Sequence, residues 1–434
     1  MSTSRVINRW LNRVYKSIAI FLVLFAVLIS GFRLFLPYVH HYREHVQNFI
    51  NSTNDSQITI GELSMDWEKL GPSIVIKQVS LLETQSTDIF IDKIHVHLDF
   101  WQSLAKGRLI TQDVTLDGAQ VFIKNFKTST KSKDKDAPLV ARIADIFLDR
   151  IGRFSLLNSQ IVFQTNQTEK LLLINQLDWL NEGDSHRGKG YVIVDGLTSN
   201  NIKVILDLHG DEIEELDGQV YLQANQLNIT PWLDTIFAID NKDTHSAINF
   251  DGWLTIDGGF PTELQVSLGN NEISWIHNKQ HKFFSVNQGQ ILTRFTKEQD
   301  NKGLKAFNIV SSPLTFITNK KSWQPTQLQF SKDSGILNGY ISDLSIEGIS
   351  DIAPLFSNDK NITQLLDQTN PVGVIKDIFL QVSKNNQAVV AGIKGVTSHP
   401  YIGIPGVSNI DGELVFKNNV AQLSLQSENG ALDF

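Results

Sequence analysis

Apolar residues form one unbroken run near the N-terminus. The run extends from Ile18 to Ile29 and continues, less strictly, to Pro37. As a helix, Val14 to Leu36 would measure about 34 Å, enough to cross a hydrocarbon core that is ~30 Å thick. The pattern therefore predicts a transmembrane helix over 14–37.

Charge around this run predicts its orientation. It is preceded by four basic residues, Arg5, Arg9, Arg13 and Lys16. By the positive-inside rule these make 1–13 a cytoplasmic segment and place the bulk of the chain across the membrane. A cleaved signal peptide is the alternative, because the strict apolar core is short and Ser30-Gly31 is small, but no A-x-A-like site follows.

Most of the remaining chain alternates apolar and other residues. After a short helical stretch at Tyr38–Phe49, which an Asn- and Ser-rich cluster ends, this two-residue period predicts β-strands with one apolar face. His95 and His97 fall opposite the apolar positions of their strand and are expected to face solvent. The pattern predicts a mainly β fold.

Glycine-containing pairs recur between these segments, at Asp117-Gly118, Asp217-Gly218, Asp251-Gly252, Gln288-Gly289, Asn338-Gly339 and Asp411-Gly412. Asp-Gly and Asn-Gly favour turns with positive φ that close antiparallel hairpins. Their uneven spacing excludes a repeat of fixed period. Together they predict one long antiparallel meander with insertions.

One break interrupts the strands that begin after residue 38. Residues 124–137 form a polar, mostly basic loop, solvated unless it contacts lipid headgroups, and 138–155 carry the apolar stripe of an amphipathic helix. Strand patterns resume over 156–434. Two further helix-prone stretches, Pro231–Phe237 and Asp351–Leu366, lie within this part.

Composition and motifs argue against catalysis. The 434 residues carry a net charge of -8 and no cysteine, which disfavours general nucleic-acid binding and excludes disulfides and thiolate chemistry. No phosphate loop, nucleophile elbow or zinc-protease motif is present. His41 and His45 have the i, i+4 spacing of metal ligands, but no third ligand is placed beside them, so solvated histidines are the simpler interpretation. We expect no enzyme and no cofactor.

Every apolar strand face must be covered, and few helices are available to cover it. Either the sheet folds over itself as a sandwich, or it curls into an open trough that holds an apolar ligand. The candidate lining of such a trough is Ile74, Ile76, Ile94, Val96, Leu98, Phe100, Val114, Leu116, Ile202, Val204, Leu206, Leu208, Leu414 and Phe416.

Several ordered motifs resemble the YhdP branch of the AsmA-like envelope proteins, which also include TamB. They are Gly31 to Pro37, Met65-Asp66-Trp67 with Leu70-Gly71-Pro72-Ser73, Leu98 to Leu104, Asn370-Pro371-Val372-Gly373, and Ile404-Pro405-Gly406-Val407 before Asp411-Gly412. The resemblance implies a single-pass inner-membrane protein of Gram-negative cells with a long periplasmic trough of β-strands. It also implies phospholipid as cargo, carried between inner and outer membrane.

The same resemblance leaves some points open. YhdP-type proteins are much longer, so we expect this chain to be an N-terminal part that carries the loading end of a conduit. An inner-membrane partner protein that loads the trough is conceivable from the resemblance. The alternative function is an anchored scaffold that helps assemble outer-membrane proteins by offering sheet edges, or that supports envelope integrity.

Overall fold

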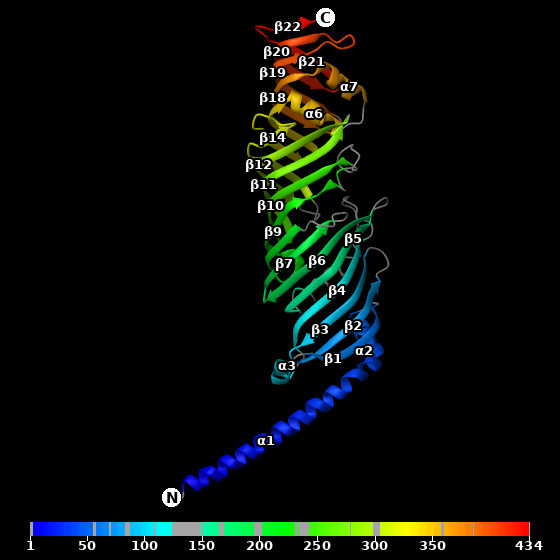
Figure 1. Ribbon diagram of the computed structural model, residues 1–434, viewed down its shortest axis with the longest axis vertical. Coiled ribbons are helices and arrows are strands. Elements are labelled where there is room, and N and C mark those ends of the chain that lie inside the picture. Colours follow the sequence, from blue (N-terminus) through cyan, green and yellow to red (C-terminus); the bar gives the residue numbers. More distant parts are fainter. Residues whose placement is uncertain are drawn as a thin grey trace. The chain divides into compact units, whose positions relative to one another are not determined.

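A computed structural model describes most of the chain. The described residues are 3–54, 58–68, 71–82, 87–107, 110–123, 148, 151–164, 169–194, 202–230, 233, 243–277, 279–297, 304–356, 360–384 and 386–433. They fall into two compact units, which Figure 1 colours along the sequence. Unit 1 comprises residues 1–126 and 150–180, and unit 2 comprises 127–149 and 181–434.

Unit 1 begins with three consecutive helices. They are α1 (Thr3–Phe35), the 3-10 helix η1 (Leu36–Tyr42) and α2 (Arg43–Asn54). Within α1, Arg13–Gly31 has a mean hydropathy of 2.2 and is long and apolar enough to cross a membrane. The apolar run thus forms the predicted helix, and the helical stretch expected after it is also confirmed.

Six strands follow in unit 1, with β6 extending slightly beyond it. They are β1 (Ile58–Glu68), β2 (Gly71–Leu82), β3 (Thr87–Leu98), β4 (Thr111–Ile123), β5 (Arg153–Gln164) and β6 (Glu169–Glu182). A short helix, α3 (Phe100–Lys106), lies between β3 and β4. The strands pair in chain order and form one ladder.

One pairing departs from the predicted meander, because β4 and β5 are parallel. Parallel neighbours need a long crossover, and residues 124–152 supply it. The predicted helix over 138–155 is wrong at its C-terminal end, since β5 already begins at Arg153. The predicted loop over 124–137, and the helix apart from Leu148 and its last residues, lie outside the described residues.

Unit 2 contains the other strands, all joined in antiparallel ladders. They are β7 (Ser185–Val194), β8 (Ile202–His209), β9 (Asp217–Leu227), β10 (His245–Asp257), β11 (Phe260–His277), β12 (Gln280–Lys297), β13 (Leu304–Ser311), β14 (Thr315–Thr318), β15 (Lys321–Ser322), β16 (Leu328–Asp333), β17 (Ile336–Ser345), β18 (Val372–Val382), β19 (Gln387–Ser398), β20 (Gly406–Lys417), β21 (Val420–Leu425) and β22 (Ala431–Asp433). The long strand β12 forks, pairing with β13 through one half and with β14 through the other.

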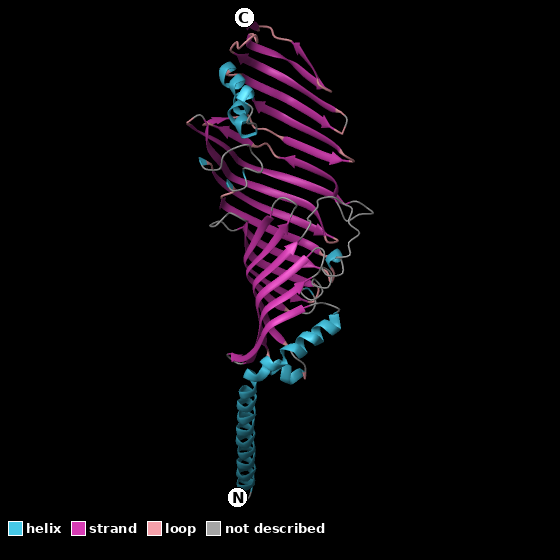
Figure 2. Ribbon diagram, turned by 90° about the vertical axis from the view of Figure 1, so that its right-hand side faces the viewer, coloured by secondary structure: helices cyan, strands magenta, loops and turns pink. Residues whose placement is uncertain are grey.

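The described residues of unit 2 form few complete helices. They are η3 (Ile213–Glu215), α6 (Ile346–Phe356) and α7 (Lys360–Thr369). The two α-helices confirm the helix-prone stretch over Asp351–Leu366, while Pro231–Phe237 lies outside the described residues except Leu233. Within each unit the described strands belong to one open ladder rather than to two packed sheets, as Figure 2 shows. The fold is mainly β, as predicted.

The glycine pairs do not close hairpins. Asp117-Gly118, Asp251-Gly252, Gln288-Gly289, Asn338-Gly339 and Asp411-Gly412 all lie inside strands, and Asp217-Gly218 begins one. Hairpin turns occur instead at Gly183-Asp184, Gly258-Gly259, Ser334-Gly335 and Asn418-Asn419. The hairpin prediction for those pairs is therefore wrong.

In unit 1 one of these glycines belongs to a row that crosses the whole sheet. The row contains one residue from each of the six strands: Gly61, Gln78, Asp92, Gly118, Asn158 and Asn175. Each lies across from the next one on the neighbouring strand, in a gap between two register pairs. Gln78, Gly118 and Asn158 have positive φ. In β3 the apolar positions change there from Ile89 and Ile91 to Ile94 and Val96. Extended residues alternate strictly between the two faces of a sheet, so moving the apolar positions by one residue interrupts the extended pattern. The positive-φ residues of the row lie at this interruption.

Unit 2 has a comparable row at Gln226, Asn249, Gly269 and Gln288. Gln226 and Gln288 have positive φ there. Asn249 fastens the row, since its Oδ1 accepts from Gln226 N (2.8 Å) and its backbone N donates to Asn271 Oδ1 (2.6 Å). At Gln288 the positive φ therefore lies inside β12 and not in the hairpin turn that sequence reasoning expected.

Candidate apolar sheet face and its membrane end

One face of unit 1 carries an apolar strip. In β1 the strip lies on the C-terminal side of Gly61, the β1 member of the unit 1 row. Register pairs place its members on the same face, for example Ile74 opposite Val96, and Val96 opposite Val114. We call this set the unit 1 strip: Leu63, Met65, Trp67, Ile74, Ile76, Ile94, Val96, Leu98, Val114, Leu116, Phe154, Leu156, Leu177 and Trp179. The structure thus brings together seven of the predicted lining residues.

The opposite face of the same strands is polar and internally bonded. Lys77 pairs with Glu62 at 3.1 Å, and Ser155 Oγ donates to Asp178 Oδ1 at 2.7 Å. His97 Nδ1 lies 3.0 Å from Asp113 Oδ2, and its ring is 4.3 Å from that of His95. Both histidines are half-buried rather than solvent-facing, but they do lie opposite the strip. The sheet is therefore amphipathic across its thickness.

Burial varies along the unit 1 strip. Leu63, Leu98, Val114, Leu116 and Phe154 are buried, whereas Ile74, Ile76, Ile94 and Val96 are half-buried. The first group packs among its neighbours as a core would. The half-buried group on β2 and β3 retains accessible apolar surface, so these are the positions at which an apolar ligand could contact the strip.

Unit 2 continues the same pattern through its own ladder. Val204 pairs with Leu222, which pairs with Gly252, and this face can be followed strand by strand to Leu414 opposite Ala391. The unit 2 strip is Ile202, Val204, Leu206, Leu208, Val220, Leu222, Ala224, Phe250, Leu254, Leu264, Val266, Leu268, Ile291, Ile309, Phe330, Ile341, Ile378, Leu380, Val389, Ala391, Leu414 and Phe416. All six predicted lining residues of this unit share that face.

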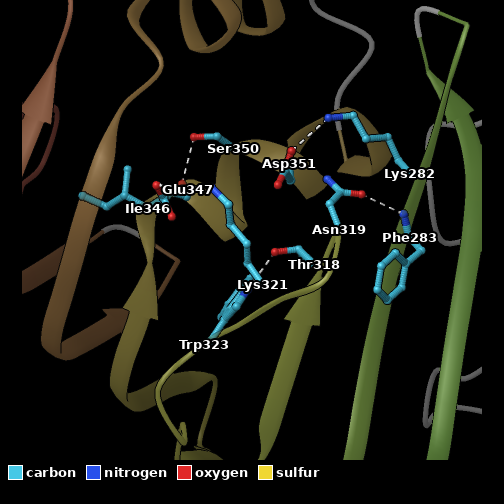
Figure 3. Close-up of polar contacts among 10 residues, drawn as sticks. All are labelled: Lys282, Phe283, Thr318, Asn319, Lys321, Trp323, Ile346, Glu347, Ser350 and Asp351. Carbon is cyan, nitrogen blue, oxygen red and sulfur yellow. Dashed lines mark hydrogen bonds and ion pairs between the residues drawn. The ribbon is translucent and has the colours of Figure 1, made fainter.

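A helix covers part of the sheet beyond the unit 2 row. Leu355 of α6 is almost fully buried in a cluster with Leu233, Ile273 and Trp275. Lys282 Nζ pairs with Asp351 of α6 at 3.0 Å, as Figure 3 shows. The apolar residues of β11 and β12 in this half therefore form an ordinary helix-on-sheet core.

Phe100 does not extend the apolar alternation of β3, contrary to the prediction. The Asp99 side chain accepts a hydrogen bond from Gln102 N at 2.9 Å and caps α3, so Phe100 is the first residue of a helix. Its ring instead packs edge-on against Trp67 at 5.4 Å. Nearby, Gly71 permits the close approach of the end of β3 to β2, because a Cβ there would lie 2.7 Å from Leu98 O.

Aromatic rings join the end of the unit 1 strip to α1. From Trp67 the contacts run through Phe100 to Trp101 (5.2 Å), from Trp101 to Phe25 (5.8 Å), and from Phe25 to Phe21 (6.0 Å). Figure 1 labels α3 at the end of the sheet near α1. Sequence analysis assigned no site role to Trp67, Trp101 or Phe25. Trp67 and Trp101 were noted only as parts of motifs that carry the resemblance, and only the fold shows that both contact Phe100.

The free edge of β1 is covered by α2 over its first residues, Ile58 to Gly61. Asn51 Oδ1 accepts from Ile58 N at 2.8 Å and its Nδ2 donates to Ile58 O at 3.0 Å. One turn earlier Gln47 Oε1 accepts from Ile60 N (2.9 Å), and Arg43 Nη1 donates to Gly61 O (3.1 Å). This i, i+4, i+8 stripe satisfies backbone groups that an edge strand otherwise offers to another chain.

Titratable groups form no reactive constellation in the part of the chain that the structure describes. Within those residues no three His, Asp or Glu side chains cluster as metal ligands. The hydrogen bond from Tyr221 to Asp251 (2.5 Å) raises the pKa of that phenol, with burial and the negative charge acting in the same direction. Tyr340 has its pKa raised in the same way by Asp377. These pairs brace neighbouring strands.

Comparison with known proteins assigns the chain to a family. A family model described as YhdP protein matches residues 1–434. The Escherichia coli K12 protein named "Intermembrane phospholipid transporter YhdP" is 28% identical over 379 residues, which cover 84% of this chain and 29% of that relative. The chain thus spans less than a third of the relative's length. No solved structure matches. The family match covers every motif on which the resemblance was based, and the chain belongs to the YhdP family.

Proposed function

We propose that this chain carries phospholipid along the apolar face of its sheets, as the inner-membrane end of a path between the two membranes. The observation that carries the proposal is the unit 1 strip, whose end at Trp67 is connected by ring contacts to the candidate membrane span. Acyl chains would lie on the strip while headgroups remain in water. The E. coli relative is named for phospholipid transport, which supports this cargo.

The physical gain is the shelter of acyl chains from water. Each buried CH₂ contributes about 0.8 kcal/mol, so two acyl chains account for on the order of 20 kcal/mol. A surface that provides part of this burial continuously needs no catalytic group and no specific pocket. The role is therefore non-enzymatic in this proposal.

The proposed topology follows from charge. Arg13 and Lys16 lie at the N-terminal end of the candidate span, with Arg5 and Arg9 before them. The positive-inside rule then places the N-terminus in the cytoplasm, with α1 as a single inner-membrane anchor and the sheets in the periplasm. An inner-membrane partner that loads the strip would complete the path.

Scaffolding through open sheet edges is the competing function. It requires unsatisfied backbone groups on edge strands, and over Ile58 to Gly61 of β1 the α2 side chains already bond to such groups. These bonds from α2 to the edge of β1 therefore favour lipid transport over edge pairing at this end of the sheet.

Photo-crosslinking on the two sheet faces tests the proposal. A benzoylphenylalanine placed at Val96, on the strip, should capture radiolabelled phospholipid in Gram-negative cells. The same residue at Val75 is the matched control, because Val75 is also half-buried but lies on the opposite face of the neighbouring strand. In unit 2, Val204 and its neighbour Ile205 form a second matched pair. Equal labelling of both faces, or none at Val96 and Val204 in folded protein, would refute lipid transport along the strips.

A further inference from the structure

The short helix α3 is built as a rigid projection from the β3–β4 connection. Besides its Asp99 cap, it is closed by Gly107 with φ 65. Asp99 N donates to Ile110 O at 2.8 Å, and Ser103 Oγ accepts from Ile110 N at 2.9 Å. The N-cap and the middle of the helix are thus both fastened to Ile110, the residue before β4.

This helix turns apolar side chains outward. Trp101 is 53% exposed and Leu104 is 60% exposed, and their i, i+3 spacing puts them on one side of α3. Gln102 and Lys106 occupy the other exposed side. A Trp and a Leu side by side on a rigid, solvent-facing helix are costly in water but typical of a membrane interface.

The contact between Trp101 and Phe25 sets the level at which this surface lies. Phe25 is within Arg13–Gly31, six residues before the end of that stretch, or about 9 Å along the helix axis. A ring stacked on Phe25 at 5.8 Å must lie at nearly the same depth. If α1 crosses the membrane over this stretch, Trp101 lies below the headgroups.

We propose that α3 is embedded in the outer leaflet of the membrane that holds α1, with Trp101 and Leu104 among the acyl chains and Lys106 at the headgroups. The proposal rests on the membrane anchoring by α1 in the proposed function. It adds a second membrane contact, which holds the Trp67 end of the unit 1 strip at the bilayer surface. The partner of this surface is thus the lipid bilayer, and an acyl chain could pass from it to the strip without crossing bulk water.

Site-directed spin labelling tests the depth of α3 in the full-length chain. The chain has no cysteine, so single cysteines introduce single labels. Leu104→Cys reports the apolar side of α3, Lys106→Cys is the matched control on its other side, and Val23→Cys reports α1. All three side chains are exposed in the structure, so labelling should not disturb folding. Each variant is reconstituted into vesicles of phosphatidylethanolamine and phosphatidylglycerol, and collisions with oxygen and with a water-soluble nickel chelate are compared.

The three labels separate the possible outcomes. We expect the oxygen-to-nickel collision ratio at Leu104 to be several-fold higher than at Lys106 and to approach that at Val23. Equal, water-like ratios at Leu104 and Lys106 with a high ratio at Val23 would overturn the embedding of α3 and leave the α1 anchor intact. A water-like ratio at Val23 would overturn the anchor and the embedding together.

Discussion

Asn51 of α2 hydrogen-bonds both backbone polar groups of Ile58, with one bond of 2.8 Å and one of 3.0 Å. This side chain reproduces what a further strand would supply at the edge of β1. Exposed edge strands are sites of unwanted pairing, and natural sheets cover or charge them. The relationship therefore both completes the ladder and isolates it from other chains.

Replacing Asn51 with Ala should loosen this edge. Loss of two hydrogen bonds at partly buried backbone groups should cost about 1–2 kcal/mol of local stability. Hydrogen exchange at the amides of Ile58 and Ile60 should accelerate, while exchange in β4 stays unchanged. Asn48→Ala, on an exposed position of the same helix, serves as the control. Unchanged exchange at Ile58 in the Asn51 variant would show that α2 does not protect the edge.

The ion pair between Lys282 and Asp351 should stabilise α6 on the sheet. Both side chains are about one quarter exposed, at 23% and 25%, so the pair lies between surface and buried cases. Lys282→Met should lower the free energy of unfolding by about 1–2 kcal/mol, because it leaves a partly desolvated carboxylate. The thermal midpoint of the detergent-solubilised chain measures this loss.

A second substitution separates charge from packing at this pair. Adding Asp351→Leu to Lys282→Met should recover part of the loss, since no unpaired charge remains. Lys321→Met is the matched control, because its pair with Glu347 is longer, at 3.6 Å, and more exposed. Equal destabilisation by the two lysine variants would mean that the partial burial of Lys282 has no energetic consequence.

Tyr221 should ionise at a higher pH than an ordinary tyrosine. Its hydrogen bond to Asp251 raises the pKa above the ordinary 10.0, because the neutral phenol donates that bond. The stabilisation is therefore fully present below pH 10 and is lost as the pH rises through the higher pKa of the folded state. Phenolate absorbance should show this tyrosine ionising after an ordinary one, and Asp251→Asn should lower its pKa towards 10. Tyr221→Phe assigns the signal, and an unchanged titration in Asp251→Asn would refute the assigned cause.

The period-two alternation was a reliable guide because it is a local property of extended chain. It predicted β2, β3, β4, β8 and β20. It also gave Ile74, Val96 and Val114 as candidate lining, and the register pairs place these three on one face. The helix that is long enough to cross a membrane was likewise predicted from one uninterrupted run of apolar residues. What the alternation could not supply was the end of a strand, and at Asp99 a side-chain cap, not hydropathy, turned the chain into α3.

Long-range features could not be predicted from the sequence, because they depend on contacts between distant parts of the chain. The parallel pairing of β4 with β5 depends on a crossover and leaves no local mark. The ring contact between Trp101 and Phe25 joins residues that are far apart in the chain. Asp-Gly pairs favour positive φ, but Gly118 adopts it inside β4 rather than in a hairpin turn, and Gly252 and Gly412 do not adopt it. Which of these occurs depends on the neighbouring strands.

Gly118 gives the sharpest test of the row that crosses unit 1. Its φ is 68, and a Cβ there would collide with the carboxylate of Asp92. Gly118→Ala should therefore cost about 1–3 kcal/mol, partly from backbone strain and partly from the clash. Gly152→Ala is the matched control, since nothing lies within 4 Å of a Cβ at that position.

Combining Gly118→Ala with Asp92→Ala separates the two contributions. The double variant should recover the part caused by the Asp92 carboxylate. It should keep the part caused by positive φ and by the Cβ of residue 92, which would still lie 2.9 Å from the new Cβ. Thermal midpoints of the three variants and the parent chain give this comparison directly. If Gly118→Ala melts like Gly152→Ala, the row tolerates a side chain at this position. The one-residue shift of apolar positions in β3 and β4 would then not depend on a glycine at residue 118.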